Sequence, residues 1–373
     1  MKDLLVTTHT PVLRSGQMVR TYGVARAMAA QRELTLLYTP FEGAEPDLTF
    51  RSIAGIELRA ATPSRGLRRG VAYAAARLRG VPVGFARGIS PELALAATQL
   101  ANEADCARVV ADGPIAAATL RDLARQRPVI YNAHNLESSF RSELSSEGRT
   151  AGNTLRAFER SLLDSAAESW MVSEADLHAA QELAPAAKLR YAPNVVDVAA
   201  ITPVVPNTSA QLAIFVANFT YEPNRTGLDF LLEQVLPRVW NELPNARLLL
   251  VGKGLDEGAV DDPRVEQAGF VPDLADVYGR ASCAVVPLLQ GGGTPLKFVE
   301  ALAYGLPIVA TSRAAAGLAV SDGVDCLLAD GSEAFAAALV RILRDGAPSI
   351  GREGRRLAVE RYSIEALSQL LAD

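Results

Sequence analysis

The chain has 373 residues, of which 49% are hydrophobic and 21% are charged, and its formal net charge is −5. This length favours two domains of an ordinary globular protein, and the weakly acidic balance gives no support for nucleic-acid binding. Cys106, Cys283 and Cys326 are odd in number and far apart, so a reducing compartment is favoured over a disulfide framework. The three histidines form no cluster with the cysteines, so no metal site is expected.

No segment has the length and apolarity of a membrane span, which needs about 18 or more apolar residues. The first apolar run turns polar at Thr7, which makes it too short for the hydrophobic region of a signal peptide. We therefore expect a cytoplasmic protein.

Short apolar segments alternate with helical segments along the first half of the chain. The predicted strands are Leu4–Thr8, Leu34–Tyr38, Ala107–Ala111, Val129–Asn132 and Trp170–Val172. A loop over Thr10–Gln17 and a helix over Met18–Ala30 are expected after the first strand. Almost wholly apolar strands separated by helices are typical of a parallel sheet that is covered on both faces.

A polar, proline-containing stretch at Asp197–Ser209 predicts a linker, after which the alternation restarts. Strands are predicted at Leu212–Val216, Arg247–Val251, Cys283–Pro287 and Ile308–Ala310, and closing helices at Ser349–Glu360 and Ser363–Leu371. The predicted fold class is α/β, with two Rossmann-like parallel-sheet domains facing each other across a cleft. We expect these domains at 1–198 and 199–350, with the helices of 351–373 crossing back to the first domain.

The strongest motif follows the predicted strand that ends at Pro287. Three glycines come next: Gly291, Gly292 and Gly293. A helix is expected to begin near Thr294, with Thr294 as its N-cap and Pro295 in its first turn. Backbone N–H groups at a helix N-terminus bind anions, and Lys297 adds a full charge one turn later. Glu300 shares this helical face and can accept hydrogen bonds from sugar hydroxyls.

This pattern predicts a phosphate-binding loop. The alternative is a flexible glycine turn followed by a helix that merely exposes Lys297 and Glu300 to solvent. The loop has neither the Gly-Lys-Ser/Thr of a Walker motif nor the Gly-x-Gly-x-x-Gly of a dinucleotide site.

Residues 291–317, GGGTPLKFVEALAYGLPIVATSRAAAG, resemble the nucleotide-sugar signature of the retaining GT-B glycosyltransferases of family 4, also called group 1. Supporting similarities lie at 131–137, 192–197, 215–224 and 248–254, and the region 40–90 shows none. The resemblance implies that the C-terminal domain binds a nucleotide-diphosphate sugar and the N-terminal domain an acceptor. It also implies transfer with retention, without a metal or another cofactor.

The residues that the resemblance assigns to nucleotide-sugar binding are Gly291, Gly292, Gly293, Thr294, Lys297, Glu300, Arg225, Asn218, Val271 and Pro272. The loop amides and Lys297 would bind the diphosphate, Glu300 the ribose, and Val271 with Pro272 the base. His134, which otherwise reads as a hydrogen-bonded core or loop histidine, would face the reacting sugar and is the second catalytic candidate beside Lys297.

Acceptor binding is expected at the first turn of the N-terminal domain. The resemblance places the Ser15-Gly16-Gln17 turn over the reacting sugar. Arg20 is a candidate contact to an anionic acceptor, although a plain surface arginine is the alternative.

Two departures from the family pattern affect the donor site. Many members carry two glutamates seven residues apart, and Gly292 replaces the first of them, so the donor sugar is left open. Asn218 stands where members often place a phosphate-binding arginine, and Arg225 or Thr226 stands near the position of their lysine. Arg225 is a candidate substitute.

The segment 51–90 holds eight arginines against one acid, Glu57. As a helix, 66–79 would have an apolar face of Leu67, Val71, Ala74 and Leu78 beside arginines. Either this face packs inward through Leu67 and Val71, or Arg65–Arg79 meets anionic lipid or a lipid-linked acceptor, which would place the protein at the inner face of the membrane.

The sequence therefore predicts a retaining, hexosyltransferase-type glycosyltransferase in polysaccharide or glycoconjugate biosynthesis. Its partners would be a nucleotide-sugar donor and a glycan, lipid-linked or small-molecule acceptor. One alternative is a sugar-nucleotide epimerase or phosphorylase on the same fold. The other is a non-catalytic nucleotide-sugar-binding protein, which the glycine at position 292 motivates.

Overall fold

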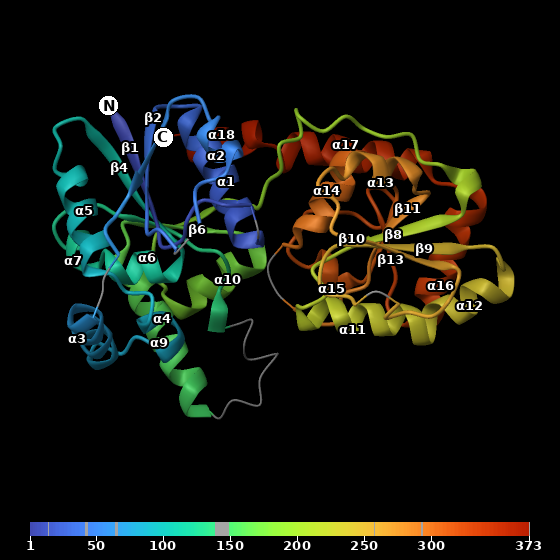
Figure 1. Ribbon diagram of the computed structural model, residues 1–373, viewed down its shortest axis with the longest axis horizontal. Helices are drawn as coiled ribbons and strands as arrows, with labels where there is room; N and C mark the ends of the chain where they lie inside the picture. Colours follow the sequence, from blue (N-terminus) through green and yellow to red (C-terminus); the bar gives the residue numbers. More distant parts are fainter. Residues whose placement is uncertain are drawn as a thin grey trace. The chain divides into compact units, whose positions relative to one another are not determined.

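The computed structural model describes residues 1–13, 15–41, 44–63, 66–138, 149–256, 258–291 and 294–372 (Figure 1). The chain forms two compact units, one of Met1–Asn194 with Leu367–Asp373 and the other of Val195–Ala366. Each unit contains a sheet of parallel strands with helices against it. The prediction of an α/β fold with two Rossmann-like domains is therefore confirmed.

The N-terminal unit has a seven-stranded sheet in the order β3-β2-β1-β4-β5-β6-β7. Its strands are β1 (Lys2–Thr7), β2 (Glu33–Tyr38), β3 (Ile56–Ala60), β4 (Cys106–Asp112), β5 (Ile130–Asn132), β6 (Glu168–Met171) and β7 (Leu189–Tyr191). Its helices are α1 (Gly16–Ala29), α2 (Leu48–Arg51), α3 (Gly66–Leu78), α4 (Val83–Ala86), α5 (Pro91–Ala101), α6 (Gly113–Thr119), α7 (Arg121–Ala124), α9 (Arg149–Ser165) and α10 (Glu174–Leu183).

All strand pairs in this sheet are parallel, and β1 lies in register between its two neighbours, with Leu5 opposite Leu36 and Val110. The strand order reverses between β1 and β4, because β2 and β3 extend to one side and β5 to β7 to the other. In open parallel sheets, ligands bind outside the carboxyl ends of the strands at such a switch point.

The C-terminal unit has a six-stranded parallel sheet in the order β10-β9-β8-β11-β12-β13, with its switch point between β8 and β11. Its strands are β8 (Leu212–Val216), β9 (Arg247–Val251), β10 (Val265–Gly269), β11 (Cys283–Val286), β12 (Ile308–Ala310) and β13 (Leu327–Leu328). Its helical segments are η1 (Thr208–Ala210), α11 (Glu222–Phe230), η2 (Leu231–Val235), α12 (Leu236–Glu242), α13 (Ala275–Arg280), α14 (Leu296–Tyr304), α15 (Ser312–Ala315), α16 (Ser332–Asp345) and α17 (Pro348–Arg361). The last helix, α18 (Ile364–Leu371), begins in this unit and ends in the N-terminal unit.

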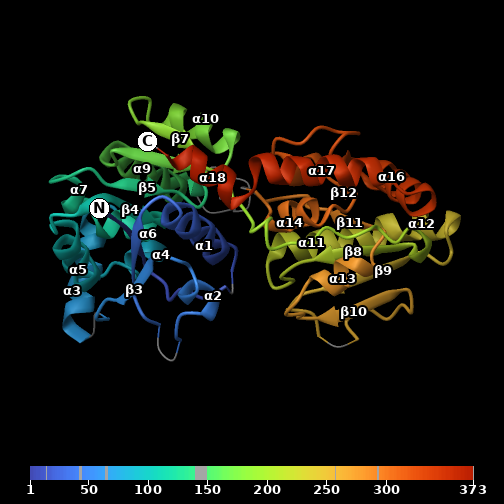
Figure 2. The same ribbon diagram turned by 90° about the horizontal axis from the view of Figure 1, so that it is seen from above.

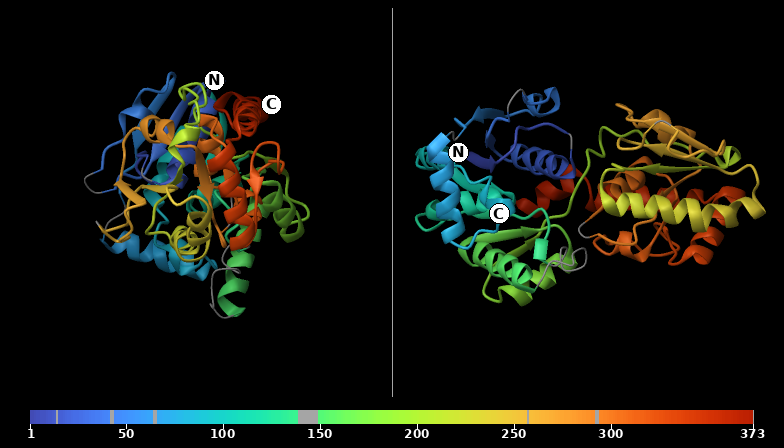
Figure 3. Two further views of the ribbon diagram at one scale, coloured as in Figure 1. Left: turned by 90° about the vertical axis from the view of Figure 1, so that its right-hand side faces the viewer. Right: turned by 60° about the horizontal axis from the view of Figure 1, so that its bottom comes forward.

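Helices cover both faces of this second sheet. One apolar cluster joins strand residues such as Phe215 to α11, α12 and α16, and another joins Ile214 to α13, α14 and α17. Figure 1 shows these two groups of helices on opposite sides of the strands. The π-helical turn η2 links α11 and α12 into the long helix seen in the right panel of Figure 3.

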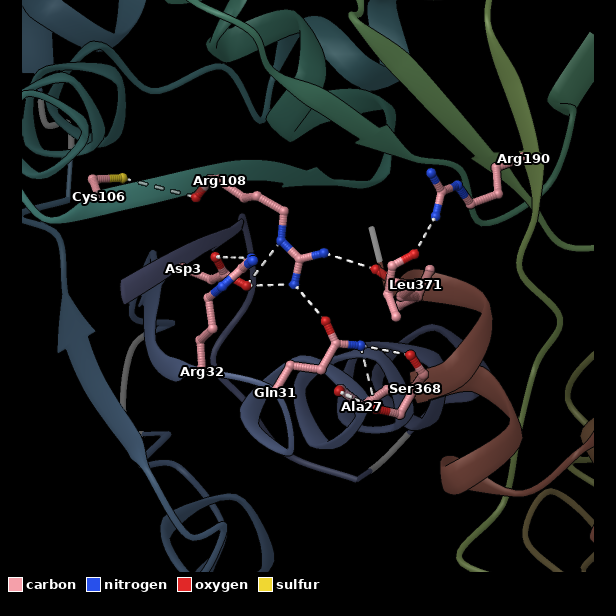
Figure 4. A network of polar contacts seen from close by, with 10 residues as sticks. Asp3, Ala27, Gln31, Arg32, Cys106, Arg108, Arg190, Ser368 and Leu371 are labelled. Carbon is pink, nitrogen blue, oxygen red and sulfur yellow. Dashed lines mark hydrogen bonds and ion pairs between the residues drawn. The ribbon is translucent and has the colours of Figure 1, made fainter. Parts of the chain in front are cut away.

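The end of the chain belongs to the N-terminal unit, where α18 lies beside α1 (Figures 1 and 2). Arg108 donates to the carbonyl oxygen of Leu371 at 2.8 Å and pairs with Asp3 at 2.5 Å. Gln31 donates to the carbonyl oxygen of Ser368 at 2.6 Å and accepts from Arg108 (Figure 4). These partly buried polar contacts, together with the buried side chain of Leu371, fix the last helix to the first sheet.

Candidate active site

Three loops meet at the carboxyl edge of the C-terminal sheet, after β8, β9 and β11. The backbones of the loops after β8 and β9 approach closely, because a Cβ atom built on Gly252 would lie 1.8 Å from the carbonyl oxygen of Ala217. A Cβ atom on Gly254 would lie 2.6 Å from the backbone nitrogen of Thr220. Only glycine fits at these two positions, and both also have positive φ angles.

Lys297 is a desolvated cation at this edge. It lies in the first turn of α14, and its Nζ donates a short hydrogen bond to Oδ1 of Asn224 on α11. Asn224 is buried and donates in turn to the backbone carbonyl of Asn218 at 2.8 Å. The Lys297 Nζ also lies 5.1 Å from the centroid of the Phe215 ring. The loop after β8 therefore positions the lysine.

Lys297 and Glu300 lie on the same face of α14, and each shifts the pKa of the other. Burial lowers the pKa of Lys297 to about 7, and Glu300 partly opposes this change. Burial likewise raises the pKa of Glu300 to about 7, which Lys297 partly opposes. A half-buried, desolvated cation that donates to a neutral amide is suited to receive an anion from outside. The interpretation that both side chains merely face solvent is therefore wrong.

The helix after the glycine loop begins at Leu296, with Pro295 as its N-cap residue. The prediction of Thr294 as N-cap is thus wrong: Thr294 is buried one residue before the N-cap position, which Pro295 occupies. Gly291 has a φ of 114°, which favours glycine, and its carbonyl accepts from Arg313 Nε at 2.7 Å. Gly292 and Gly293 lie outside the described residues.

The other residues assigned to the donor occupy the same edge. Arg225 is exposed in α11 and Asn218 is exposed after β8. The Asn218 side chain accepts from the backbone and hydroxyl of Thr220, so it shapes its own loop. Val271 and Pro272 follow β10, where Val271 packs on the sheet and Pro272 is exposed. Their assignments remain predictions that this placement permits.

His134 lies at the carboxyl edge of the N-terminal sheet, just after β5, and is buried. Its Nε2 is 2.9 Å from Oδ1 of Asp112, the last residue of β4. Asp112 also accepts from Thr21 at 2.6 Å and from Asn132 at 2.7 Å. Burial alone would raise the pKa of Asp112, but His134 and these donors hold the pKa below its ordinary value. A carboxylate only accepts, so His134 Nε2 donates the proton to it.

Gly113 makes room for this histidine. Its φ is 84°, and a Cβ atom there would lie 3.0 Å from Cε1 of His134. Although His9 after β1 is largely exposed, desolvation of its ring lowers its pKa, whereas Asp112 raises that pKa and His134 lowers it. His9, Asp112 and His134 therefore share one electrostatic environment at the switch point of this sheet.

Arg20 lies beneath this group instead of on the surface. Its residue is 2% exposed, and its guanidinium donates to Asn132 at 2.6 Å, to the carbonyl of Ala192 at 2.9 Å and to Asn194 at 3.2 Å. Burial lowers the pKa of Arg20 to about 10, so it remains charged at neutral pH. The alternative of a surface arginine is therefore wrong. The two terminal nitrogens of Arg20 donate internally, and its assignment as an acceptor contact stays a prediction.

The turn before α1 differs in detail from the prediction. The helix begins at Gly16, two residues earlier than expected, because Ser15 caps it by accepting from the amide of Met18 at 3.4 Å. Ser15, Gly16 and Gln17 are exposed. Their predicted role toward an acceptor stays a prediction.

The sequence analysis gave Asn224 and Asn132 no function, and Asp112 was not among its site residues. The available signal was position: Asp112 and Asn132 end two adjacent parallel strands at the switch point, where polar side chains converge. Among the described residues, no group of three or more His, Cys, Asp or Glu side chains could hold a metal ion.

Residues 210–345 match the family described as glycosyl transferases group 1. With the two Rossmann-like sheets, this match bears out the predicted resemblance to group 1 glycosyltransferases, for a stretch that lies within the C-terminal unit. No curated protein sequence matches the chain significantly.

Solved glycosyltransferase structures share the fold along the whole chain. A sucrose-phosphate synthase from Thermosynechococcus elongatus superposes with a TM-score of 0.73 at 18% identity, covering 99% of this chain and 97% of that one. Anabaena HepE, solved with UDP and glucose, gives 0.69 at 17% identity, covering 98% and 97%. A variant of S. aureus TarM, solved with Fondaparinux, alpha-GlcNAc-glycerol and UDP, gives 0.72 at 9% identity, covering 99% of both chains.

Proposed function

We propose that the protein transfers a sugar from a nucleotide-diphosphate sugar to an acceptor hydroxyl with retention of configuration. The observation that carries the proposal is the desolvated Lys297, held by Asn224 at the N-terminus of α14 and at the switch point of the sheet. A diphosphate there would meet the first amides of the helix and the lysine charge together.

The leaving group of such a transfer is the nucleoside diphosphate, so negative charge develops on its β-phosphate. Lys297 and the helix amides would stabilise this charge without moving, and fixed donors of this kind typically provide the largest catalytic term. Glu300, three residues along the same face, would accept hydrogen bonds from the ribose. HepE and TarM were solved with UDP, which makes UDP the first nucleotide to test.

In the N-terminal unit, the His134–Asp112 pair is proposed to contact the reacting sugar. Asp112 holds Nε2 of His134 and so fixes the orientation of the ring, which leaves Nδ1 in one defined position to contact the sugar. The described residues offer no nucleophilic carboxylate pair in one motif, and we therefore favour a front-face substitution in which the leaving phosphate accepts the acceptor's proton.

The acceptor is proposed to be a glycan, a lipid-linked sugar or a small molecule in polysaccharide or glycoconjugate synthesis, and the protein is proposed to act in the cytoplasm. In the described part of the chain, no helix is long and apolar enough to cross a membrane.

A thermal-shift panel with UDP, GDP, ADP and their sugar derivatives tests the proposal. Wild type is compared with Lys297→Met and with Lys188→Met, a control whose side chain is 70% exposed in the other unit. Ligand at a hundredfold excess over Kd adds about 2.7 kcal/mol to the native state. We expect one nucleotide to stabilise wild type and the control, and the Lys297 variant to lose most of that shift. If no nucleotide stabilises wild type, or if the variant keeps the full shift, the proposal fails.

A further inference from the structure

Helix α3 turns its apolar stripe away from the protein. Leu67, Val71 and Leu78 are 88%, 63% and 89% exposed, whereas the buried side chains of this helix are Ala72 and Ala76. At 100° per residue, the three large side chains lie within about 40° of one another on the side opposite the two alanines. The interpretation that Leu67 and Val71 pack inward is therefore wrong.

The two buried alanines of α3 hold the helix in this orientation. Ala76 joins the core of the N-terminal unit, with Tyr73 packed against that core, and Ala72 is also buried. Their small side chains bring the helix backbone close to the unit, and the larger side chains are left on the outer side. Figures 1 and 3 show α3 at the margin of the N-terminal unit, outside α4.

Arg68 and Arg79 lie about 100° from the exposed stripe on one side, and Arg77 lies about 100° from it on the other side. The segment 66–90 contains five arginines and no acidic residue: Arg68, Arg69, Arg77, Arg79 and Arg87. The acids from elsewhere that reach this group do so weakly: Glu92 lies 4.0 Å from Arg68, and Asp122 lies 3.3 Å from Arg79 at a well-exposed position. A net positive surface therefore surrounds the three apolar side chains.

We propose that α3 is a docking helix for an anionic lipid surface. An amphipathic helix with large apolar side chains on one side and arginines along its flanks lies in the plane of a membrane, with the apolar side inserted and the arginines at the headgroups. The 13 residues of α3 give a contact about 20 Å long. Positive charge beside the stripe favours an anionic bilayer over a second copy of the chain, which would bring like charges together.

The proposal predicts binding to phosphatidylglycerol-containing vesicles, measured by co-sedimentation of the full chain, and no binding to phosphatidylcholine alone. Leu67→Glu combined with Leu78→Glu should weaken binding at least tenfold. Arg68→Gln combined with Arg79→Gln should weaken it about 25-fold, since each basic residue near an anionic leaflet contributes roughly a factor of five. Added salt should weaken wild-type binding.

Two matched controls distinguish binding through α3 from non-specific binding of the protein to vesicles. Leu95→Glu changes another leucine of the same unit that is 61% exposed, and Arg352→Gln removes an exposed arginine of the other unit. Both should bind vesicles as wild type does, and all variants should keep the wild-type melting temperature. Equal binding by the α3 variants and wild type would overturn the proposal. So would absence of binding to anionic vesicles, or a wild-type dimer in sedimentation velocity that Leu67→Glu with Leu78→Glu abolishes.

Discussion

Replacing Lys297 by methionine should stabilise the ligand-free protein while removing nucleotide binding. Burial lowers the pKa of Lys297 from 10.5 to about 7. The unfolded chain therefore binds more protons than the folded chain between these pH values, so the wild-type free energy of unfolding rises with pH across this window. At pH 7 or below, the lysine costs the folded state about 5 kcal/mol as an upper bound.

Methionine removes this cost. It also leaves Oδ1 of Asn224 without its donor, which lowers the free energy of unfolding by about 1–3 kcal/mol. The net gain should be about 2 kcal/mol at pH 6.5, equivalent to a Tm increase of about 4–8 °C for a unit of this size. The gain should vanish near pH 9. There the charge cost of the wild-type lysine has fallen to about 2 kcal/mol, because mainly the unfolded chain still binds the proton, and the lost hydrogen bond of Asn224 offsets this remainder.

Differential scanning calorimetry at pH 6.5 and pH 9 measures both effects, with Lys188→Met as the control for removal of an exposed lysine. A lower Tm for Lys297→Met at pH 6.5 would show that the lysine serves the fold. A gain independent of pH would show that its charge is not the cause. Either result refutes the argument that a desolvated cation is held ready for an anion.

Three further changes test the remaining parts of the site. His134→Ala should lower kcat for sugar transfer about a hundredfold or more and leave the nucleotide-induced thermal shift unchanged, because the histidine lies in the N-terminal unit. Arg20→Met should lower the free energy of unfolding by about 2–4 kcal/mol in urea melts, since it leaves buried acceptors such as Asn132 unpaired; an unchanged midpoint would contradict its burial. Gly227→Ala places a Cβ atom 2.7 Å from the carbonyl oxygen of Pro287, so it should lower the free energy of unfolding by about 1–3 kcal/mol. It should also displace α11, which carries Asn224, and therefore weaken UDP binding in calorimetric titration. Unchanged affinity for UDP would contradict this link between Gly227 and the site.

The sequence predicted the strands that are buried on both faces, because their apolar runs leave no other interpretation. Leu212–Val216, Arg247–Val251 and Ile308–Ala310 are strands at the predicted bounds. It missed β3 and β10 near the sheet edges, where the burial pattern is mixed and polar residues such as Glu57 and Glu266 interrupt the run. Edge strands have one neighbour and one exposed side, so their sequences carry a weaker signal.

In the candidate site, sequence motifs predicted the residues that one segment contains, and missed those that distant segments bring together. Lys297 and Glu300 stand three residues apart on one helix, so their common face was readable. The bond between Lys297 and Asn224 joins residues 73 positions apart, and the pair of His134 with Asp112 joins neighbouring strands. Arg20 showed no local sign of burial, because its partners Asn132 and Ala192 come from two other strands or loops.

The central claim is that this chain cleaves a nucleotide sugar at Lys297, at the carboxyl edge of the C-terminal sheet. Proton NMR of the best-binding nucleotide sugar, incubated with wild type, Lys297→Met and Lys188→Met, tests it most directly. Wild type and the control should release the nucleoside diphosphate and a sugar that keeps the donor's anomeric configuration at first appearance, and Lys297→Met should slow this release about a hundredfold or more. A donor that binds wild type yet remains intact with every acceptor supplied would contradict the claim and identify a non-catalytic nucleotide-sugar-binding protein.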